Sequence, residues 1–422
     1  MNKVKKLLKV LGPGFITGAS DDDPSGIGTY AQTGAMFGYN QLWTALFSLP
    51  FMTVVQEMCG RIGMVTGTGL AGVLKIHYTR KVLYIAVGIL FIANTINIGA
   101  DLGAMAASAQ LILGIPFWVW LLIITATTIS LEVFVSYPAY ARLLKYLTLS
   151  LFAYIVTVFV IKQDWMHILS GTIIPSFTFN KDYLLNIVAL LGTTISPYLF
   201  FWQADEEVEE EIEHHQLRAM GKGVPRITKR DIREMRLDTI VGMLFSNIVM
   251  FFIIVTTAST LGAHGIKDIQ TADQAASALR PFAGDFAFLL FALGIIGTGL
   301  LAVPILAGSA SYAISEAFNM KAGLSKRFTQ AHGFYAIIAL ATLLGFLINF
   351  TSIKPFTLLY YTAILNGVAA PPLLVLIMLT ANNSKIMGKY TNNRTVNMLG
   401  WAITSVMSLA ALALVASLIF FK

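Results

Sequence analysis

Apolar runs of about 20 residues alternate with short polar connections along almost the whole chain. A helix of that length spans the hydrocarbon core of a bilayer, because an α-helix rises about 1.5 Å per residue. Eleven such runs lie near residues 12–36, 42–64, 82–112, 116–136, 144–162, 183–204, 238–262, 286–317, 329–349, 356–380 and 397–421. The pattern predicts an all-α polytopic membrane protein in which residues 1–422 form one transmembrane domain with eleven helices.

Two of these runs are interrupted near their middle. In the first, Asp21–Asp23 are followed by Pro24 and Gly26, and the sixth contains Pro197 after the polar segment GTTIS. Proline removes a backbone donor and clashes with the preceding turn, and glycine disfavours helix, so both helices should unwind here. Unwound backbone and acidic side chains at membrane depth indicate a cation site. The alternative for the first break is a short surface loop in which Asp23 caps the next helix.

The two interruptions are five runs apart, which favours an inverted-repeat transporter with its site near the bilayer midplane. An odd number of spans in each half places the halves in opposite orientations. We therefore expect a first repeat over 1–165, a second over 183–380, and an additional helix over 397–421.

Composition and charge agree with a membrane location. Hydrophobic residues make up 56% of the chain and charged residues 12%, and the mean hydropathy is +0.72. The single cysteine, Cys59, excludes an intrachain disulfide framework and a thiolate metal cluster, and MNKVKK enters the first run without a cleavage motif, so no signal peptide is expected. With a cytoplasmic N-terminus only six of the 29 basic residues lie outside, so we predict N-inside, C-outside, in a bacterial inner membrane.

Three segments resemble the Nramp divalent-metal transporters. GPGFITGASDDDPSG, at 12–26, resembles their first span, and TTISPYLFFWQ, at 193–203, resembles their sixth. INIGADLGAMAASAQLILGIP, at 96–116, is similar to their third span. The resemblance implies the 5+5 inverted-repeat fold of amino-acid/sodium symporters, with helices one and six broken.

The resemblance also implies which residues hold the ion. The family's metal-binding aspartate falls on Asp23, and its asparagine, alanine and methionine fall on Gly26, Thr193 and Ser196; an aspartate of span three falls on Asp101. Loss of the soft thioether leaves oxygen ligands, which suit magnesium and manganese, and the smaller side chains leave room for retained water. This pattern is similar to the Nramp-related magnesium transporters. For the hydroxyl residues the alternative is a bond back to a helix carbonyl.

Titratable groups of the family are also missing. Its two histidines fall on Tyr198 and Gln203, and its glutamate in span three falls on Ala104. Histidine is the side chain that titrates near neutrality, so we expect transport without obligatory proton coupling. Further residues expected along the pathway or around the ligands are Asp22, Ser25, Tyr198, Gln203, Asp101 and Asn366.

The remaining charged residues allow two interpretations each. The stretch 205–236 begins DEEVEEEIEHH, which predicts either a solvated helix extension and loop on the cytoplasmic side or an acidic vestibule for cations. Glu57 and Glu132 face protein or water, and they could pair with Arg61 and Arg142.

The leading functional prediction is a secondary transporter, not an enzyme, that imports Mg²⁺ and/or Mn²⁺ by alternating access. It would work as a monomer or weak oligomer in the lipid bilayer, without a cofactor and without nucleic acid. A proton-coupled Mn²⁺/Fe²⁺ transporter of the ordinary Nramp type is the alternative. An intramembrane prenyltransferase that holds magnesium diphosphate on DDD is more remote, because the only other dense acidic cluster lies at the far end of the sixth run.

Overall fold

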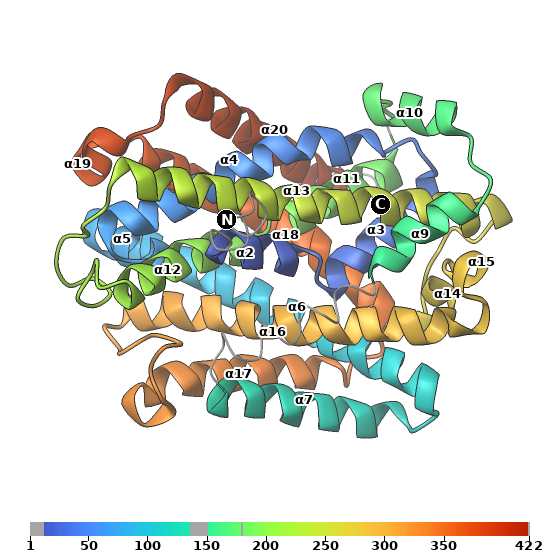
Figure 1. Ribbon diagram of the computed structural model, residues 1–422, viewed down its shortest axis with the longest axis horizontal. Coiled ribbons are helices and arrows are strands. Elements are labelled where there is room, and N and C mark those ends of the chain that lie inside the picture. The colour runs from blue at the N-terminus through green and yellow to red at the C-terminus, as the bar shows by residue number, and fades with distance from the viewer. Residues whose placement is uncertain (1–11, 136–150, 179, 421–422) are drawn as a thin grey trace, which may run out of the picture.

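The apolar runs fold into long helices that lie roughly side by side (Figure 1). The computed structural model describes residues 12–135, 151–178 and 180–420, and these residues form no strand. The helices are α2 (Pro13–Asp21), α3 (Pro24–Phe37), α4 (Trp43–Thr66), α5 (Leu70–His77), α6 (Arg80–Leu113), α7 (Phe117–Phe134), α9 (Phe152–Val160), α10 (Trp165–Ile173), α11 (Lys181–Thr194), α12 (Pro197–Glu213), α13 (Lys229–Thr260), α14 (Ala272–Ser277), α15 (Arg280–Ala283), α16 (Ala287–Ala317), α17 (His332–Ile348), α18 (Pro355–Ala381), α19 (Ser384–Met387) and α20 (Arg394–Phe420).

The prediction of a helical membrane protein is confirmed. In the described part of the chain, seven helices or joined helix pairs are long and apolar enough to cross a membrane, and α17 is a shorter apolar helix. The predicted span near 144–162 lies partly outside the described residues, and its remainder contains α9. The number of eleven spans stays a prediction.

Both predicted interruptions are confirmed. The first run is divided into α2 and α3, and the sixth into α11 and α12. Helix α13 packs against both α2 and α3, whereas α12 packs against α4. The first span thus packs against the seventh, and the sixth span packs against the second. In two related halves of five spans, spans one and six correspond, as do spans two and seven, so these two contacts are equivalent. The boundaries 1–165 and 183–380 stay a prediction.

Glycines allow the broken helices to approach their neighbours closely. A Cβ on Gly18 would lie 2.2 Å from the carbonyl oxygen of Gly242 in α13. A Cβ on Gly192 in α11 would lie 2.1 Å from the carbonyl oxygen of Ala363 in α18. Small residues let membrane helices pack through their backbones. These contacts fix α2 against α13 and α11 against α18, and thereby hold the two breaks at the centre of the molecule.

Segments predicted to lie on one side of the membrane gather at one end of the molecule. Helices α5 and α19 and the C-terminal half of α12 lie together at the left of Figure 1, and α10, α14 and α15 lie at the right. The left end is the one predicted to face the cytoplasm. Which end actually does so stays a prediction.

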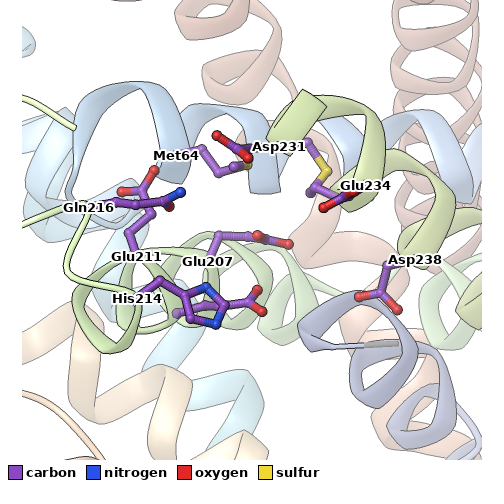
Figure 2. Close-up of a pocket in the computed structure, with 10 residues that line it drawn as sticks. Met64, Glu207, Glu211, His214, Gln216, Asp231, Glu234 and Asp238 are labelled. Carbon is purple, nitrogen blue, oxygen red and sulfur yellow. The ribbon is translucent and has the colours of Figure 1, made fainter. Parts of the chain in front are cut away.

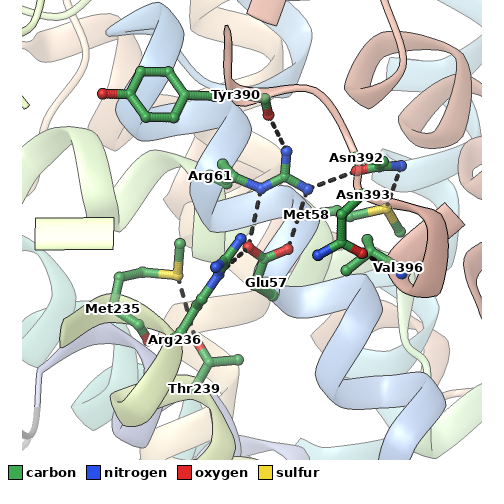
Figure 3. Close-up of polar contacts among 10 residues, drawn as sticks. All are labelled: Glu57, Met58, Arg61, Met235, Arg236, Thr239, Tyr390, Asn392, Asn393 and Val396. Atoms are coloured by element: carbon green, nitrogen blue, oxygen red, sulfur yellow. Dashed lines mark hydrogen bonds and ion pairs between the residues drawn. The ribbon is translucent and has the colours of Figure 1, made fainter. Parts of the chain in front are cut away.

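Glu57 takes part in a buried ion-pair network, so its pairing with Arg61 is confirmed (Figure 3). Its Oε1 accepts hydrogen bonds from Arg61 Nε at 3.0 Å and from Arg236 Nε at 2.7 Å. Arg61 also donates to the Tyr390 carbonyl and, at 2.6 Å, to Asn392 Oδ1. The network joins α4, α13 and the segment before α20, so Glu57 has a structural role.

Glu132 is bound differently from Glu57. Its Oε2 accepts a hydrogen bond from Thr342 Oγ1 at 3.5 Å, which joins α7 to α17. Arg142, its other predicted partner, lies outside the described residues.

Candidate cation site

The first break places Asp23 at the start of α3. Its backbone is extended, and its Oδ1 accepts hydrogen bonds from the Gly26 amide at 2.6 Å and from Ser25 Oγ at 2.7 Å. Pro24 occupies the first helical position, where a missing amide proton costs nothing. Asp23 therefore caps α3, but the surface-loop alternative is wrong because its side chain is buried.

The second break lies between Thr194 and Pro197. Ser196 Oγ donates to the carbonyl oxygens of Gly192 and Thr193 at 2.8 and 2.6 Å, so its hydroxyl bonds back to its own helix. This is the alternative interpretation of that residue. Its role as a metal ligand stays a prediction.

The two breaks meet at Gly26. A Cβ built on this glycine would lie 3.0 Å from the Asp21 carbonyl oxygen, 3.2 Å from Thr193 Oγ1 and 3.3 Å from Asp23 Oδ1. In addition, Tyr198 Oη in α12 donates to the Ser20 carbonyl at 2.9 Å. Oxygens from both broken helices therefore converge on Gly26, where a side chain would be crowded, and three of the four predicted metal residues lie together here.

Helix α6 brings a second carboxylate to Asp23. Asn97 Nδ2 lies 2.9 Å from Asp23 Oδ2 and 3.4 Å from Asp101 Oδ2, and it bridges the two acids. Asp101 therefore lies close to Asp23, while its role along the ion pathway stays a prediction. Asn97 was not among the predicted residues. Its position four residues before Asp101, on the same helix face, is the signal that could have identified it.

Asp21 and Asp22 complete a group of buried acids. Ser246 Oγ in α13 donates to Asp21 Oδ2 at 2.6 Å and contacts Asp22 Oδ1 at 3.3 Å, while one oxygen of each aspartate has no hydrogen-bond partner. Neither these acids nor Asp23 and Asp101 take part in any ion pair among the described residues. Buried charge without a counter-charge is costly. A bound cation would supply the missing compensation.

Two further predicted pathway residues lie on α12 and α18. Gln203 Nε2 donates to Glu207 Oε1 at 2.7 Å, so Gln203 faces the acidic half of α12. Asn366 is buried in α18, which packs against both α3 and α11, and its Nδ2 has no hydrogen-bond partner. The roles of both residues along the pathway stay predictions.

A cavity of about 150 Å³ and one of about 310 Å³ lie on different sides of the breaks. The larger one reaches Gly28, two residues from Gly26, and is bordered by Gln32, Asp182, Asp268 and Tyr360 among others. The residues lining the smaller one include none from either break. The larger cavity therefore contacts helix α3 beyond the first break, and the smaller one contacts neither break.

The oxygens that converge on Gly26 come from one carboxylate, one hydroxyl and one backbone carbonyl. No group of three or more His, Cys, Asp or Glu side chains within the described ranges is arranged to hold a metal ion. The predicted combination of hard ligands and retained water stays a prediction.

These features define a class of protein: a helical membrane transporter with a polar centre between two broken helices. The chain belongs to the Nramp family, since residues 14–417 match the family model described as natural resistance-associated macrophage protein-like. It is 26% identical over 425 residues to the divalent metal cation transporter MntH of Klebsiella pneumoniae, covering 99% of this chain and 96% of that protein.

Solved structures show the same fold. The crystal structure of the Eremococcus coleocola manganese transporter, in complex with an aromatic bis-isothiourea substituted compound, matches with a TM-score of 0.77 at 16% identity, over 99% of this chain and 88% of that one. Mhp1, a nucleobase-cation-symport-1 family transporter in a closed conformation with bromovinylhydantoin bound, matches with a TM-score of 0.56 at 11% identity, over 96% and 90% of the two chains. The predicted family and fold are confirmed.

Proposed function

We propose that this chain is a secondary transporter that imports divalent metal cations, Mg²⁺ and/or Mn²⁺, by alternating access and without obligatory proton coupling. The observation that carries the proposal is the convergence of oxygens from both broken helices on Gly26, beside buried acids that have no basic partner among the described residues. The similarity to a divalent metal cation transporter supports the coarser part, transport of divalent metals.

The choice of ion follows from the ligand chemistry. Thioether and thiolate ligands favour soft transition metals, and carboxylate, hydroxyl, carbonyl and water oxygens favour Mg²⁺ and Mn²⁺. Asp23 Oδ1, Thr193 Oγ1 and the Asp21 carbonyl are all hard oxygens. Because Mg²⁺ loses water reluctantly, it would bind there with part of its water shell, as cargo and not as a resident cofactor.

Alternating access requires the central site to open to one side of the membrane while it is closed to the other. The Tyr198–Ser20 hydrogen bond couples α12 to α2, and both lie on the side of the breaks predicted to face the cytoplasm. Their joint displacement from α3 and α11 would connect the centre with the smaller cavity and close it from the larger. The inward-negative membrane potential would then drive entry, at about 4.6 kcal/mol per 100 mV for a divalent ion.

Proton coupling separates this proposal from its alternative, ordinary proton-coupled Mn²⁺/Fe²⁺ transport. Tyr198 is engaged as a donor to Ser20 and Gln203 as a donor to Glu207, and neither side chain cycles protons at neutral pH. The buried acids Asp23 and Asp101, bridged by Asn97, and their neighbours Asp21 and Asp22 are the described groups at the centre that could still carry one. The prenyltransferase alternative loses its support with membership of a transporter family.

The experiment uses proteoliposomes that contain a pH-sensitive dye and a metal indicator. With an inside-negative potential, addition of Mn²⁺ or Mg²⁺ should give saturable entry without internal acidification, and Ca²⁺ should serve as the competing hard ion. Acidification that scales with metal uptake would contradict uncoupled transport. Absence of uptake of all three ions would contradict the proposed function itself.

A further inference from the structure

The smaller cavity is surrounded by carboxylates. It has a volume of about 150 Å³ and lies between the C-terminal half of α12, the N-terminal half of α13 and the end of α4 (Figure 2). Its acidic lining residues are Glu207, Glu210, Glu211, Asp231, Glu234 and Asp238. Figure 2 shows Glu207 extending toward the middle of this ring, opposite Asp231 and Glu234. The prediction that 205–213 extends the sixth helix is confirmed. The prediction that this extension is solvated is wrong for Glu207 and Glu211, because both side chains are buried.

The carboxylates of this ring are poorly neutralised. Within the described ranges their only ion pair is Glu234–Arg230 at 2.8 Å, on the exposed side of α13. Burial raises the pKa of Glu210, and His214, which also lines the cavity, lies close enough to lower that pKa in part. Glu211 is only 2% exposed, and neither of its carboxylate oxygens has a hydrogen-bond partner. Burial, together with Asp231 and Glu210, raises the pKa of Glu211 to about 8, so its ionised form is costly here. A cation in the cavity would compensate that ionised form.

The geometry excludes direct ligation of one ion by several of these side chains. No three His, Cys, Asp or Glu side chains of the described chain are close enough together to form a metal-ligand set. However, a volume of 150 Å³ holds about five water molecules at roughly 30 Å³ each. The cavity therefore fits a cation that keeps most of its six-water shell and is held mainly by charge.

The cavity lies along the path from the central site. Gln203, Glu207 and Glu211 are four residues apart, so they share one face of α12. From Ser196 to Glu207 the helix rises about 16 Å. Asp238 also accepts hydrogen bonds from the Gly14 and Phe15 amides at the start of α2, at 2.7 and 3.1 Å. Both broken helices thus end at this cavity.

We propose that the cavity is a second binding site, which holds a hydrated divalent cation by outer-sphere contacts between the central site and the α12 end of the molecule. Acidic clefts concentrate cations by focusing the electric field. The identity of the arriving ion rests on the proposed function, but binding in the cavity does not depend on transport.

The experiment measures Mn²⁺ binding to the purified full-length protein through the loss of the free-ion electron paramagnetic resonance signal. The Asp23→Ala variant lacks the central carboxylate, and we expect it to retain a weak class of bound Mn²⁺. In that background Glu211→Gln should weaken the remaining class about tenfold, since one carboxylate about 6 Å from a divalent ion across water is worth about that factor. Glu207→Gln together with Glu211→Gln should weaken it further, and raised salt should do the same.

Glu213→Gln is the matched control, because Glu213 is an exposed acid on the same helix that does not line the cavity. It should leave the weak class unchanged. The proposal is overturned if Asp23→Ala binds no Mn²⁺, or if Glu211→Gln and Glu213→Gln, both monodisperse, bind it equally. By contrast, normal transport by Asp23→Ala would contradict the proposed role of Asp23 at the central site. It would not contradict cation binding in the cavity.

Discussion

Replacement of Asp23 tests the central site most directly. Asp23→Asn keeps the volume of the side chain and an oxygen that can accept from the Gly26 amide and Ser25 Oγ, but it removes the formal charge. Asp23→Ala removes the charge and the N-cap together, and loss of a cap costs about 1 kcal/mol of stability. Comparison of the two variants therefore separates the binding of the ion from the folding of α3.

Coulomb's law gives a lower limit for the loss of Mn²⁺ affinity in these variants. A divalent ion and a carboxylate 4 Å apart attract each other by about 2 kcal/mol even at the dielectric constant of water, and a buried site gives more. Loss of the charge should therefore weaken the apparent affinity for Mn²⁺ at least about 30-fold in both variants. Both variants lose the Oδ2 that accepts from Asn97 Nδ2, so the bridge to Asp101 is broken in each. Asp23→Ala also loses the oxygen that caps α3, so this variant should be the more impaired.

The assay is uptake of Mn²⁺ into proteoliposomes over a range of concentrations, with melting curves of the purified variants. Asp164→Asn is the matched control, because Asp164 is also an N-cap, of α10, but it is exposed and remote from the breaks. It should transport like the unaltered protein. The reasoning is refuted if Asp23→Asn transports Mn²⁺ with unchanged affinity while it folds as stably as Asp164→Asn.

Three further substitutions test separate parts of the structure. Gly26→Ala places a methyl group 3.0–3.3 Å from the three oxygens of the centre and should lower Mn²⁺ affinity at least about tenfold, whereas Gly28→Ala, whose Cβ faces only the Leu359 side chain, should retain uptake. Ser196→Met should raise Cd²⁺ binding relative to Mg²⁺ in isothermal calorimetry, because it returns a thioether and fills water space; an unchanged ratio would place Ser196 away from the ion. Arg61→Ala leaves the buried Glu57 with one partner and should cost about 3 kcal/mol of stability, seen as a lower melting temperature with unaltered Mn²⁺ affinity.

The sequence by itself determined the helical membrane architecture and the two breaks. Hydrophobic run length and the positions of Pro24 and Pro197 are local properties, and local chemistry decides whether a helix continues. The same holds for Asp23, because a carboxylate within a break at membrane depth is informative without knowledge of its neighbours.

Tertiary structure decided which groups meet. The Asn97–Asp23 contact joins residues 74 positions apart, and Ser246 meets Asp21 across 225. Such pairs leave no trace in the period of a single helix. The burial of Glu211 likewise depends on what α12 packs against. Charged residues at the end of an apolar run look the same in sequence whether they face water or a closed cavity, because burial is a property of the assembled helices.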